Sequence, residues 1–392
     1  MKIGIDKISF HVPHYYVHMN DLADARGVER EKFTIGIGQD EMAVAPITQD
    51  PVTLAANAAA NFLSDEDKEA IDFVMFCTET GIDHSKSAGI FVHELLGLRT
   101  DVRTIELKQA CYSATAALQL AMSHIALYPD KKVLVLASDI ARYGIATPGE
   151  VTQGAGAVAF LMSANPRIMT LDKESSYVTK DIMDFWRPTY SDVAFVDGKY
   201  SNEQYIAFFN DVWNRYKEKA DRSLADFAAV CFHLPYTKMG LKALQTVLDD
   251  ADETTKERLL EQYDKSVVYS RRVGNIYSAS LYLGFVSLLE NSSLQAGDRI
   301  GMFSYGSGAV GEFYSGTLVD GFEDHLRAKE HRQLFEARTQ LSIAEYEEIF
   351  EKSLPTDGST VSFEVADDPA PICLSGVTEH KRQYVNKVTA SV

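Results

Sequence analysis

An internal repeat is the feature that most constrains how this chain can fold. The stretch IDFVMFCTET (71–80) resembles DFAAVCFHLP (226–235) at an offset of 154 residues, so Glu79 is aligned with His233. Both stretches are typical of apolar strands that end in a polar residue. Because a duplicated unit places equivalent residues at equivalent ends of its two copies, the repeat limits where an active site can lie.

Two further correspondences follow in the same order. The segment KQACYSATAALQLA (108–121) resembles RVGNIYSASLYLGF (272–285), and Asn275 falls opposite Cys111 to within one residue; both indicate a loop that enters a helix. The third match consists of short β-rich runs bounded by glycine: KKVLVLASD (131–139) and GAGAVAFLMS (154–163) pair with DRIGMFSYGSG (298–308) and GEFYSGTLV (311–319). Three matches in register predict two packed α/β layers related by an approximate twofold axis.

The repeat also predicts a single pocket. Glu79, Cys111, His233, Asn275 and the glycine-rich loop YGSG (305–308) all fall at predicted ends of strands or helices. Ligands of α/β sheets bind at such ends, so we expect these five segments to meet in one catalytic site.

Cys111 is the candidate nucleophile of that site. It stands at the predicted start of a small-residue helix, where free backbone N–H groups and the helix dipole favour the thiolate. The alternative is a buried small hydrophobe, since most free cysteines are of that kind. The chain has four cysteines and no C-x-x-C pair, which argues against a disulfide framework and a structural zinc site and indicates a reducing compartment.

Composition excludes several classes of function. The 392 residues, 46% of them hydrophobic, can bury a large core in two units of structure. A net charge of −18 without a basic stripe argues against nucleic acid as a partner. No run of 18 apolar residues occurs, and the start MKIGIDKISF lacks the pattern of a signal peptide. We therefore expect a cytoplasmic protein with no membrane partner.

Three regions are predicted along the chain. Residues 1–167 form the first half of the repeat and residues 168–320 the second half, in which about 168–222 is an aromatic-rich helical insertion. Residues 321–392 form a C-terminal helical segment and a tail, and the tail is expected to be a strand pair or a loop after Pro355.

Seven motifs give the chain a family resemblance. It resembles the 3-hydroxy-3-methylglutaryl-CoA synthases of the bacterial mevalonate pathway of isoprenoid biosynthesis, within the thiolase-like superfamily. The resemblance implies a duplicated, five-layer αβαβα thiolase-like fold, a homodimer, and no metal or redox cofactor. The motifs are CTETG around Glu79, ELKQACYSAT around Cys111, TQGAGAVA from Thr152, DFWRP (184–188), FHLPYTKMG around His233, VGNIY around Asn275, and FSYGSGAVGEF around Ser307.

The resemblance also implies a reaction and its residues. Acetyl-CoA and acetoacetyl-CoA condense with water to give 3-hydroxy-3-methylglutaryl-CoA and CoA. Cys111 accepts the acetyl group, Glu79 is the general acid/base, and His233 anchors and protonates acetoacetyl-CoA. Lys238 and Lys242 match positions that meet the anionic part of CoA, although paired lysines on one helical face are often only solvated. Further matches line the acyl site: Tyr143, Thr152, Ser201, Asn275 and Ser307.

Other proteins of this fold remain alternatives. A type III ketoacyl synthase or a plant-type polyketide synthase draws its carbanion from decarboxylation and needs no carboxylate base, so Glu79 argues against both. A thiolase carries a second cysteine near the C-terminal glycine-rich loop, and Cys373 lies well beyond it. A non-catalytic partner subunit is expected to lack the nucleophile, so Cys111 argues against that reading.

Overall fold

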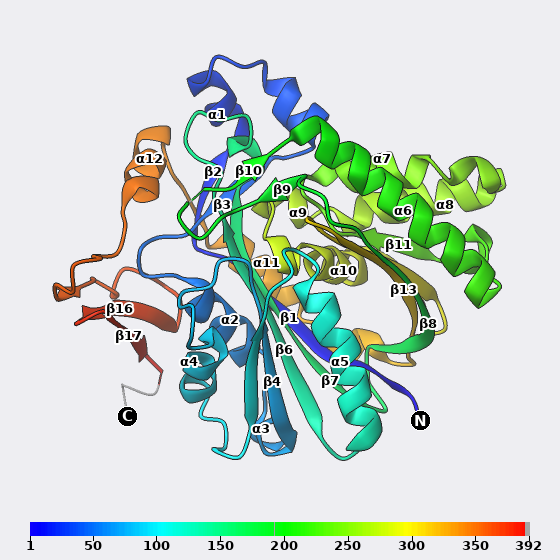
Figure 1. Cartoon of the computed structure of the whole chain (residues 1–392), viewed down its shortest axis with the longest axis horizontal. Helices are drawn as coiled ribbons and strands as arrows, with labels where there is room; N and C mark the ends of the chain where they lie inside the picture. The colour runs from blue at the N-terminus through cyan, green and yellow to red at the C-terminus, as the bar shows by residue number, and fades with distance from the viewer. Residues whose placement is uncertain (192, 389–392) are drawn as a thin grey trace.

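Two half-sheets of the same topology form the centre of the molecule (Figure 1). The computed structural model describes residues 1–191 and 193–388. The first half contributes β1 (Ile3–His11), β4 (Ile71–Cys77), β5 (Arg103–Leu107), β6 (Lys132–Ala141) and β7 (Gly154–Ala164). The second contributes β8 (Met169–Thr179), β11 (Ala229–Phe232), β12 (Arg299–Gly306) and β13 (Val310–Leu318).

The strand order confirms the duplication. The sheet runs β11-β12-β13-β8-β1-β7-β6-β4-β5, so β8, β11, β12 and β13 occupy the places that β1, β4, β6 and β7 hold in the first half. The two half-sheets are joined by strand pairing where Gly4 and Ile5 of β1 pair with Thr170 and Met169 of β8. A Cβ on Gly4 would lie 2.0 Å from the Met169 carbonyl oxygen, so this contact requires glycine.

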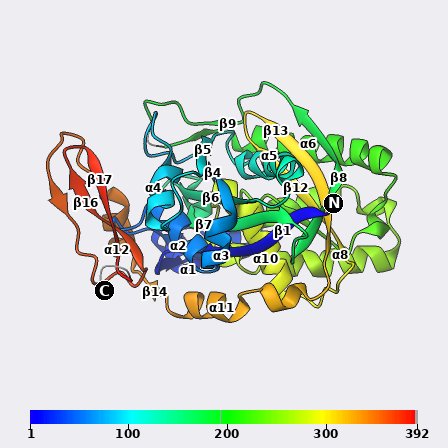
Figure 2. The same ribbon diagram turned by 90° about the horizontal axis from the view of Figure 1, so that it is seen from below.

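Three layers of helices alternate with the half-sheets, which makes five layers in all (Figure 2). One apolar core joins α5 and α10 to strands of both halves. The outer cores lie on the far side of each half-sheet. The α/β, five-layer, duplicated thiolase-like fold expected from the sequence is therefore confirmed. The central helices are α5 (Ser113–Leu127) and α10 (Ser280–Asn291), and the outer ones are α2 (Pro51–Ala60) and α4 (Ala88–Leu95) on the first half, with α6 (Gly198–Ala220), α7 (Thr237–Gln245) and α8 (Glu253–Ser266) on the second.

The segment 168–222 differs from the helical insertion that we expected. It begins with β8, which pairs with β13 inside the large sheet, and continues through the short pair β9 (Phe185–Trp186) and β10 (Phe195–Val196). Among the described residues of this segment, only those of α6, which the Asp197 side chain caps, are helical. The error has a physical cause: β8 buries few of its side chains, so its polar residues hide the alternation that identifies a strand.

Smaller elements surround this body. In the tail, β16 (Ile372–Thr378) and β17 (Lys381–Asn386) form the strand pair that was one of the two expectations, and they lie beside α2 and α4 at the left of Figure 1. Among the described residues, no helix combines the length and apolar character needed to cross a membrane. The remaining elements include α1 (Met19–Ala25), β2 (Tyr15–His18), β3 (Glu41–Val44), α3 (Asp65–Ala70), α9 (Ser270–Val273), α11 (Ala328–Glu336), β14 (Thr339–Gln340), α12 (Ile343–Glu351) and β15 (Val361–Ser362).

Candidate active site

The predicted nucleophile and base lie in direct contact. Cys111 immediately precedes Tyr112, the N-cap residue of α5, and Ala110 before it has a positive φ of 45°, which turns the chain sharply at this point. Glu79 follows the end of β4 by two residues. The Cys111 thiol donates a hydrogen bond to Glu79 Oε1, with 3.1 Å between Sγ and the oxygen.

Burial governs the ionisation of this pair. It raises the pKa of Glu79 to about 8, and the nearby charge of Asp139 adds to the rise. Burial, together with the charge of Glu79, also raises the pKa of Cys111 well above its usual range. The expectation that the helix dipole favours a thiolate in the free protein is therefore wrong. Cys111 lies outside the first turn of α5, where desolvation and a neighbouring carboxylate outweigh the dipole.

Asp139, near the end of β6, holds the Glu79 loop in place. This fully buried carboxylate accepts a hydrogen bond from the Glu79 backbone N–H at 2.9 Å and from the Thr78 hydroxyl at 2.8 Å. It also accepts from the backbone N–H of Ser278, at 3.0 Å, and so links the two halves of the repeat. The sequence analysis missed Asp139, although an acid at the end of an apolar run is the signal that identified Glu79.

His233 occupies the position in the second half that Glu79 holds in the first. Its backbone N–H donates to the Phe303 carbonyl at 2.8 Å, and its carbonyl accepts from the Tyr205 hydroxyl at 2.6 Å. Burial lowers the pKa of His233 to about 3, so the ring is neutral at neutral pH. Within the described residues the buried Nδ1 atom has no hydrogen-bond partner, and the residue itself lines the cavity described below.

Asn275 is fixed so that its amide group faces the same space. Its Oδ1 atom accepts from the Tyr277 backbone N–H and the Ser280 hydroxyl, both at 2.9 Å. Its Nδ2 atom donates to the Tyr143 hydroxyl at 3.3 Å. The two local bonds thus fix which end of the amide points toward the cavity.

The loop YGSG presses against the turn that carries Cys111. A Cβ on Gly306 would lie 2.6 Å from both the Gln109 carbonyl oxygen and Tyr112 Cβ, so only glycine allows this approach. Asp184, fully buried, holds the loop by accepting from the Tyr305 hydroxyl at 2.7 Å and the Gly308 N–H at 2.9 Å. The motif DFWRP contained Asp184, but sequence reasoning gave it no role.

Most of the predicted residues line one cavity of about 620 Å³. Glu79 reaches this cavity through its contact with Cys111. Lys238 and Lys242 lie outside its lining on α7, and Lys242 Nζ is held 2.9 Å from the hydroxyl of Tyr236, which does line it. Predicted residues in the lining are Cys111, Tyr143, Thr152, Ser201, His233, Asn275 and Ser307.

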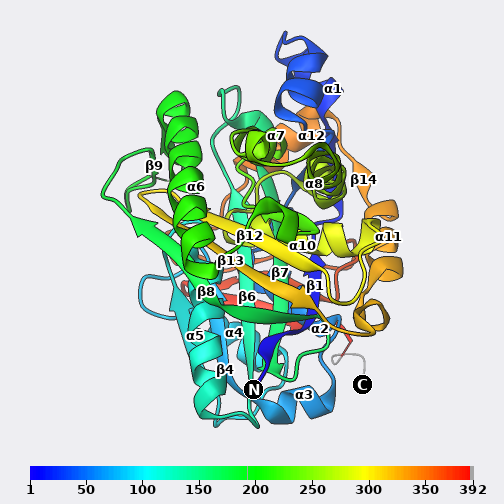
Figure 3. The same ribbon diagram turned by 90° about the vertical axis from the view of Figure 1, so that its right-hand side faces the viewer.

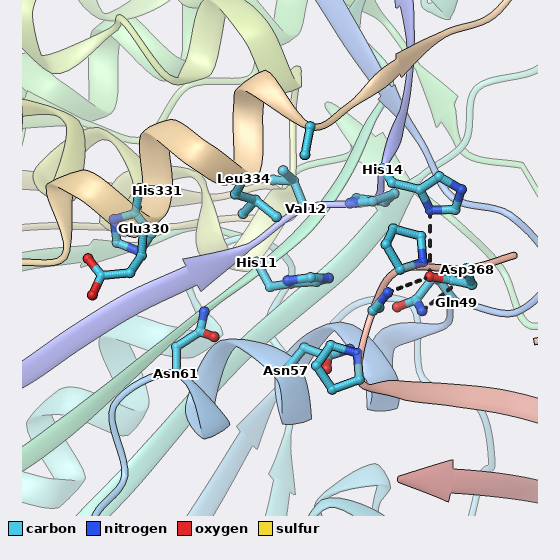
Figure 4. Close-up of a pocket in the computed structure, with 15 residues that line it drawn as sticks. His11, Val12, His14, Gln49, Asn57, Asn61, Glu330, His331, Leu334 and Asp368 are labelled. Atoms are coloured by element: carbon cyan, nitrogen blue, oxygen red, sulfur yellow. Dashed lines mark hydrogen bonds and ion pairs between the residues drawn. The ribbon is translucent and has the colours of Figure 1, made fainter. Parts of the chain in front are cut away.

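A different cavity, of about 250 Å³, lies between β1, α2, α11 and the tail (Figure 4). It contains titratable groups, among them His11, His331 and Asp368, but none of the predicted site residues lines it. Figure 3 shows α11 and α5 on opposite sides of the molecule. Within residues 1–191 and 193–388, no cluster of three or more His, Cys, Asp or Glu side chains is arranged to hold a metal ion.

Comparison with known proteins decides the family. The family models described as hydroxymethylglutaryl-coenzyme A synthase N terminal and C terminal match residues 1–167 and residues 170–257 and 245–360. The hydroxymethylglutaryl-CoA synthase of Enterococcus faecalis is 53% identical over 387 residues, which cover 98% of this chain and 100% of that protein. The chain belongs to the hydroxymethylglutaryl-CoA synthase family. The recognition made from the motifs is thereby confirmed, and with it the class of acyl-transferring condensing enzyme.

Solved structures of this family agree with the fold. A crystal structure of an HMG-CoA synthase complexed with CoA superposes with a TM-score of 0.96 at 47% identity and covers 98% of this chain and 100% of that one. A structure of MvaS in complex with 3-hydroxy-3-methylglutaryl coenzyme A gives a TM-score of 0.90 at 34% identity, with coverages of 98% and 99%. The part of this chain that matches the N-terminal family model contains Cys111 and Glu79. The part that matches the C-terminal model contains His233 and Asn275.

Proposed function

We propose that this chain condenses acetyl-CoA with acetoacetyl-CoA and water to give 3-hydroxy-3-methylglutaryl-CoA and CoA, through an acetyl-Cys111 intermediate. The observation that carries the proposal is the 3.1 Å contact between Cys111 and Glu79 at a cavity that His233 and Asn275 also line. The reaction belongs to the mevalonate pathway of isoprenoid biosynthesis, and we place it in the cytoplasm. It needs no cofactor, because the CoA thioesters are themselves the substrates.

The first step transfers the acetyl group. Glu79 is placed to take the Cys111 proton as the sulfur attacks the thioester carbonyl, since the thiol already donates to that carboxylate. CoA leaves as the thiol, and Cys111 becomes an acetyl thioester. Backbone N–H groups of Cys111 and Ser307 are our candidates for stabilising the oxyanion.

The second step forms the carbon–carbon bond. Glu79 takes a proton from the acetyl methyl group, for which a pKa of about 8 makes it a stronger base than an ordinary carboxylate. The carbanion attacks the ketone of acetoacetyl-CoA, which the neutral His233 ring orients by donating a hydrogen bond to the forming alkoxide. The alkoxide takes the proton that Glu79 holds, and Glu79 is then a carboxylate again. Water then cleaves the Cys111 thioester.

CoA enters, in this proposal, past α7. Tyr236 lines the cavity and carries Lys242 on its outer side, so an anionic group at the mouth would meet that ammonium. Lys238 is the second candidate. Arg271 is less suited, because it already makes a paired contact with Asp40.

We also propose a homodimer. Strand β5 is one of the two edges of the large sheet and leaves Ile105 45% exposed. Apolar side chains of neighbouring elements are exposed as well, including Leu120 and Leu127 of α5. A second copy of the chain would cover this edge and these side chains. Sedimentation at micromolar protein should give about twice the chain mass of 43.5 kDa, and a mass near 43.5 kDa would refute the dimer.

The reaction is tested by mixing the purified protein with each substrate in turn. Acetyl-CoA alone should add one acetyl group to the protein and release CoA thiol. Acetoacetyl-CoA should then consume the acetyl-protein and give 3-hydroxy-3-methylglutaryl-CoA, identified by mass spectrometry. If a malonyl thioester with decarboxylation is required instead, the protein is a ketoacyl synthase and the proposal fails.

A further inference from the structure

A second cavity lies on the other side of the catalytic pair. In the single chain it has a volume of about 820 Å³ and is bordered by the loop after β4, the start of α4, the segment 187–191 and strand β5, whose edge the proposed second copy would cover. Of the predicted site residues, only Glu79 lines it, whereas Cys111 lines the substrate cavity. The hydrogen bond between Cys111 and Glu79 therefore crosses the wall that separates the two cavities.

The two cavities differ in polarity, and therefore in how readily they hold water. The substrate cavity is walled by aromatic side chains such as Phe185, Tyr205 and Tyr277. The second cavity is lined by charged and hydroxyl-bearing side chains, among them Asp83, Glu106, Lys86, Lys108 and Thr104. A cavity of this size with many charged and hydroxyl groups holds water more readily than one with largely aromatic walls.

One residue in the wall of the second cavity has a polar atom without a partner. The Thr104 Oγ1 atom is buried and makes no hydrogen bond within the described residues, although Thr104 lines the cavity. Beside it, Arg187 donates to the Glu79 carbonyl and thereby ties the segment 187–191 to the catalytic loop. The cavity is thus built against Glu79.

We propose that this cavity supplies the water that hydrolyses the Cys111 thioester at the end of the reaction. The inference rests on the proposed function. At that stage the product is joined both to Cys111 and to CoA, so its CoA arm fills the substrate cavity and its mouth. Water must then come from the Glu79 side.

The chemistry of the step balances at Glu79. A water molecule gives one proton to the Glu79 carboxylate while its oxygen attacks the thioester carbonyl carbon. The carbon–sulfur bond to Cys111 breaks, and the departing sulfur takes the proton from Glu79. The products are the Cys111 thiol and the free carboxylic acid of 3-hydroxy-3-methylglutaryl-CoA, which keeps the second proton of the water until it ionises.

Filling the second cavity tests the proposal. Gly81 lines it, and a Cβ there would meet only the far end of the Glu106 side chain, at 2.9 Å from Oε1. Gly81→Leu should occupy part of the cavity, and Gly81→Ala is the matched control with a single added carbon. Ser85→Trp fills it from the exposed part of the same loop and keeps the test valid if Gly81→Leu does not fold.

The expected result is specific to one step. In the filled variants, acetylation and carbon–carbon bond formation should stay within about threefold of the wild type, while turnover falls by at least about tenfold. Intact-protein mass spectrometry of the quenched reaction should show the 3-hydroxy-3-methylglutaryl-CoA adduct accumulating on Cys111. Unchanged turnover in both folded variants would overturn the proposal, as would a slow reaction in which acetyl-protein accumulates instead.

A failure of the underlying reaction gives a different result. If the wild-type protein forms no acetyl-Cys111 or no adduct, the proposed function itself is wrong. Sedimentation of each variant beside the wild type shows whether a filled cavity has altered assembly, and a filled variant with wild-type mass and wild-type hydrolysis counts against the water route.

Discussion

Glu79 and His233 occupy the same place in the two halves of the molecule, yet burial affects them in opposite directions. It raises the pKa of the carboxyl to about 8 and lowers the pKa of the imidazole to about 3. At neutral pH both groups are therefore mostly uncharged: the Glu79 carboxyl keeps its proton, and the His233 ring carries one proton rather than two. Desolvation disfavours the charged form of each group, so the Glu79 carboxylate is a stronger base than usual and the His233 imidazole a weaker one.

Their contacts differ as well. Glu79 is bonded to the nucleophile, whereas the His233 ring has a buried nitrogen without a partner in the described residues. In our proposal the first half therefore transfers the proton at Cys111 and the second half recognises the second substrate. Each prediction below tests that division, beginning with the largest effect.

Replacing the nucleophile should remove all activity. We expect Cys111→Ala to show no acetyl adduct with acetyl-CoA and no turnover, because no other described cysteine contacts Glu79. Intact-protein and peptide mass spectrometry would locate the label. Cys231→Ala, a buried cysteine of the second half, is the matched control and should still be acetylated. An acetyl group found on Cys77, Cys231 or Cys373 would show that Cys111 is not the nucleophile.

Replacing the base should separate the two chemical steps. We expect Glu79→Gln to accept the acetyl group still but more slowly, because the Cys111 proton must then pass to water, a loss offset in part by the lower pKa of Cys111 without the carboxylate charge. Condensation should fall by about 10²–10⁴-fold, the usual contribution of a general base. Rapid-quench measurement of both steps checks this. Glu290→Gln, another buried carboxylate, controls for the loss of a buried acid, and condensation within tenfold of wild type would refute the assignment.

Replacing His233 should weaken only the second substrate. His233→Ala is expected to lower kcat/KM for acetoacetyl-CoA by about 10- to 150-fold, because a hydrogen bond to a developing charge contributes about 1.5–3 kcal/mol. His233→Gln keeps a donor and should recover part of the loss. Titration with acetoacetyl-CoA in the absence of acetyl-CoA gives the affinity. An unchanged affinity for acetoacetyl-CoA would show that His233 does not recognise the second substrate.

A change of pH should alter the rate of condensation by a smaller factor than these substitutions do. A carboxyl with a pKa of about 8 is about one-tenth ionised at pH 7 and nine-tenths at pH 9, so condensation should rise about tenfold over that range. His233, with a pKa of about 3, stays neutral throughout. Preformed acetyl-protein mixed with saturating acetoacetyl-CoA provides the profile. A rate that falls across this range would mean that an acid, not a base, limits the step.

The sequence predicted more of the fold than of the environment of the site. The repeat predicted the duplicated α/β halves, because apolar strands and helix starts leave local signals, and seven of the predicted residues line one cavity. It did not predict the ionisation of Cys111, which depends on how deeply the turn is buried against Glu79. The positions of Asp139 and Asp184 were missed for the same reason: their roles are contacts with residues distant in sequence.

The most direct test of the division between the halves is the single-turnover rate of acetyl transfer from acetyl-CoA in the His233→Ala variant. If His233 serves only the second substrate, Cys111 should be acetylated within about threefold of the wild-type rate, with Glu79 taking its proton. If His233 is instead the base that activates Cys111, acetylation should collapse while the affinity for acetoacetyl-CoA is preserved. That second result would contradict the assignment of proton transfer to the first half.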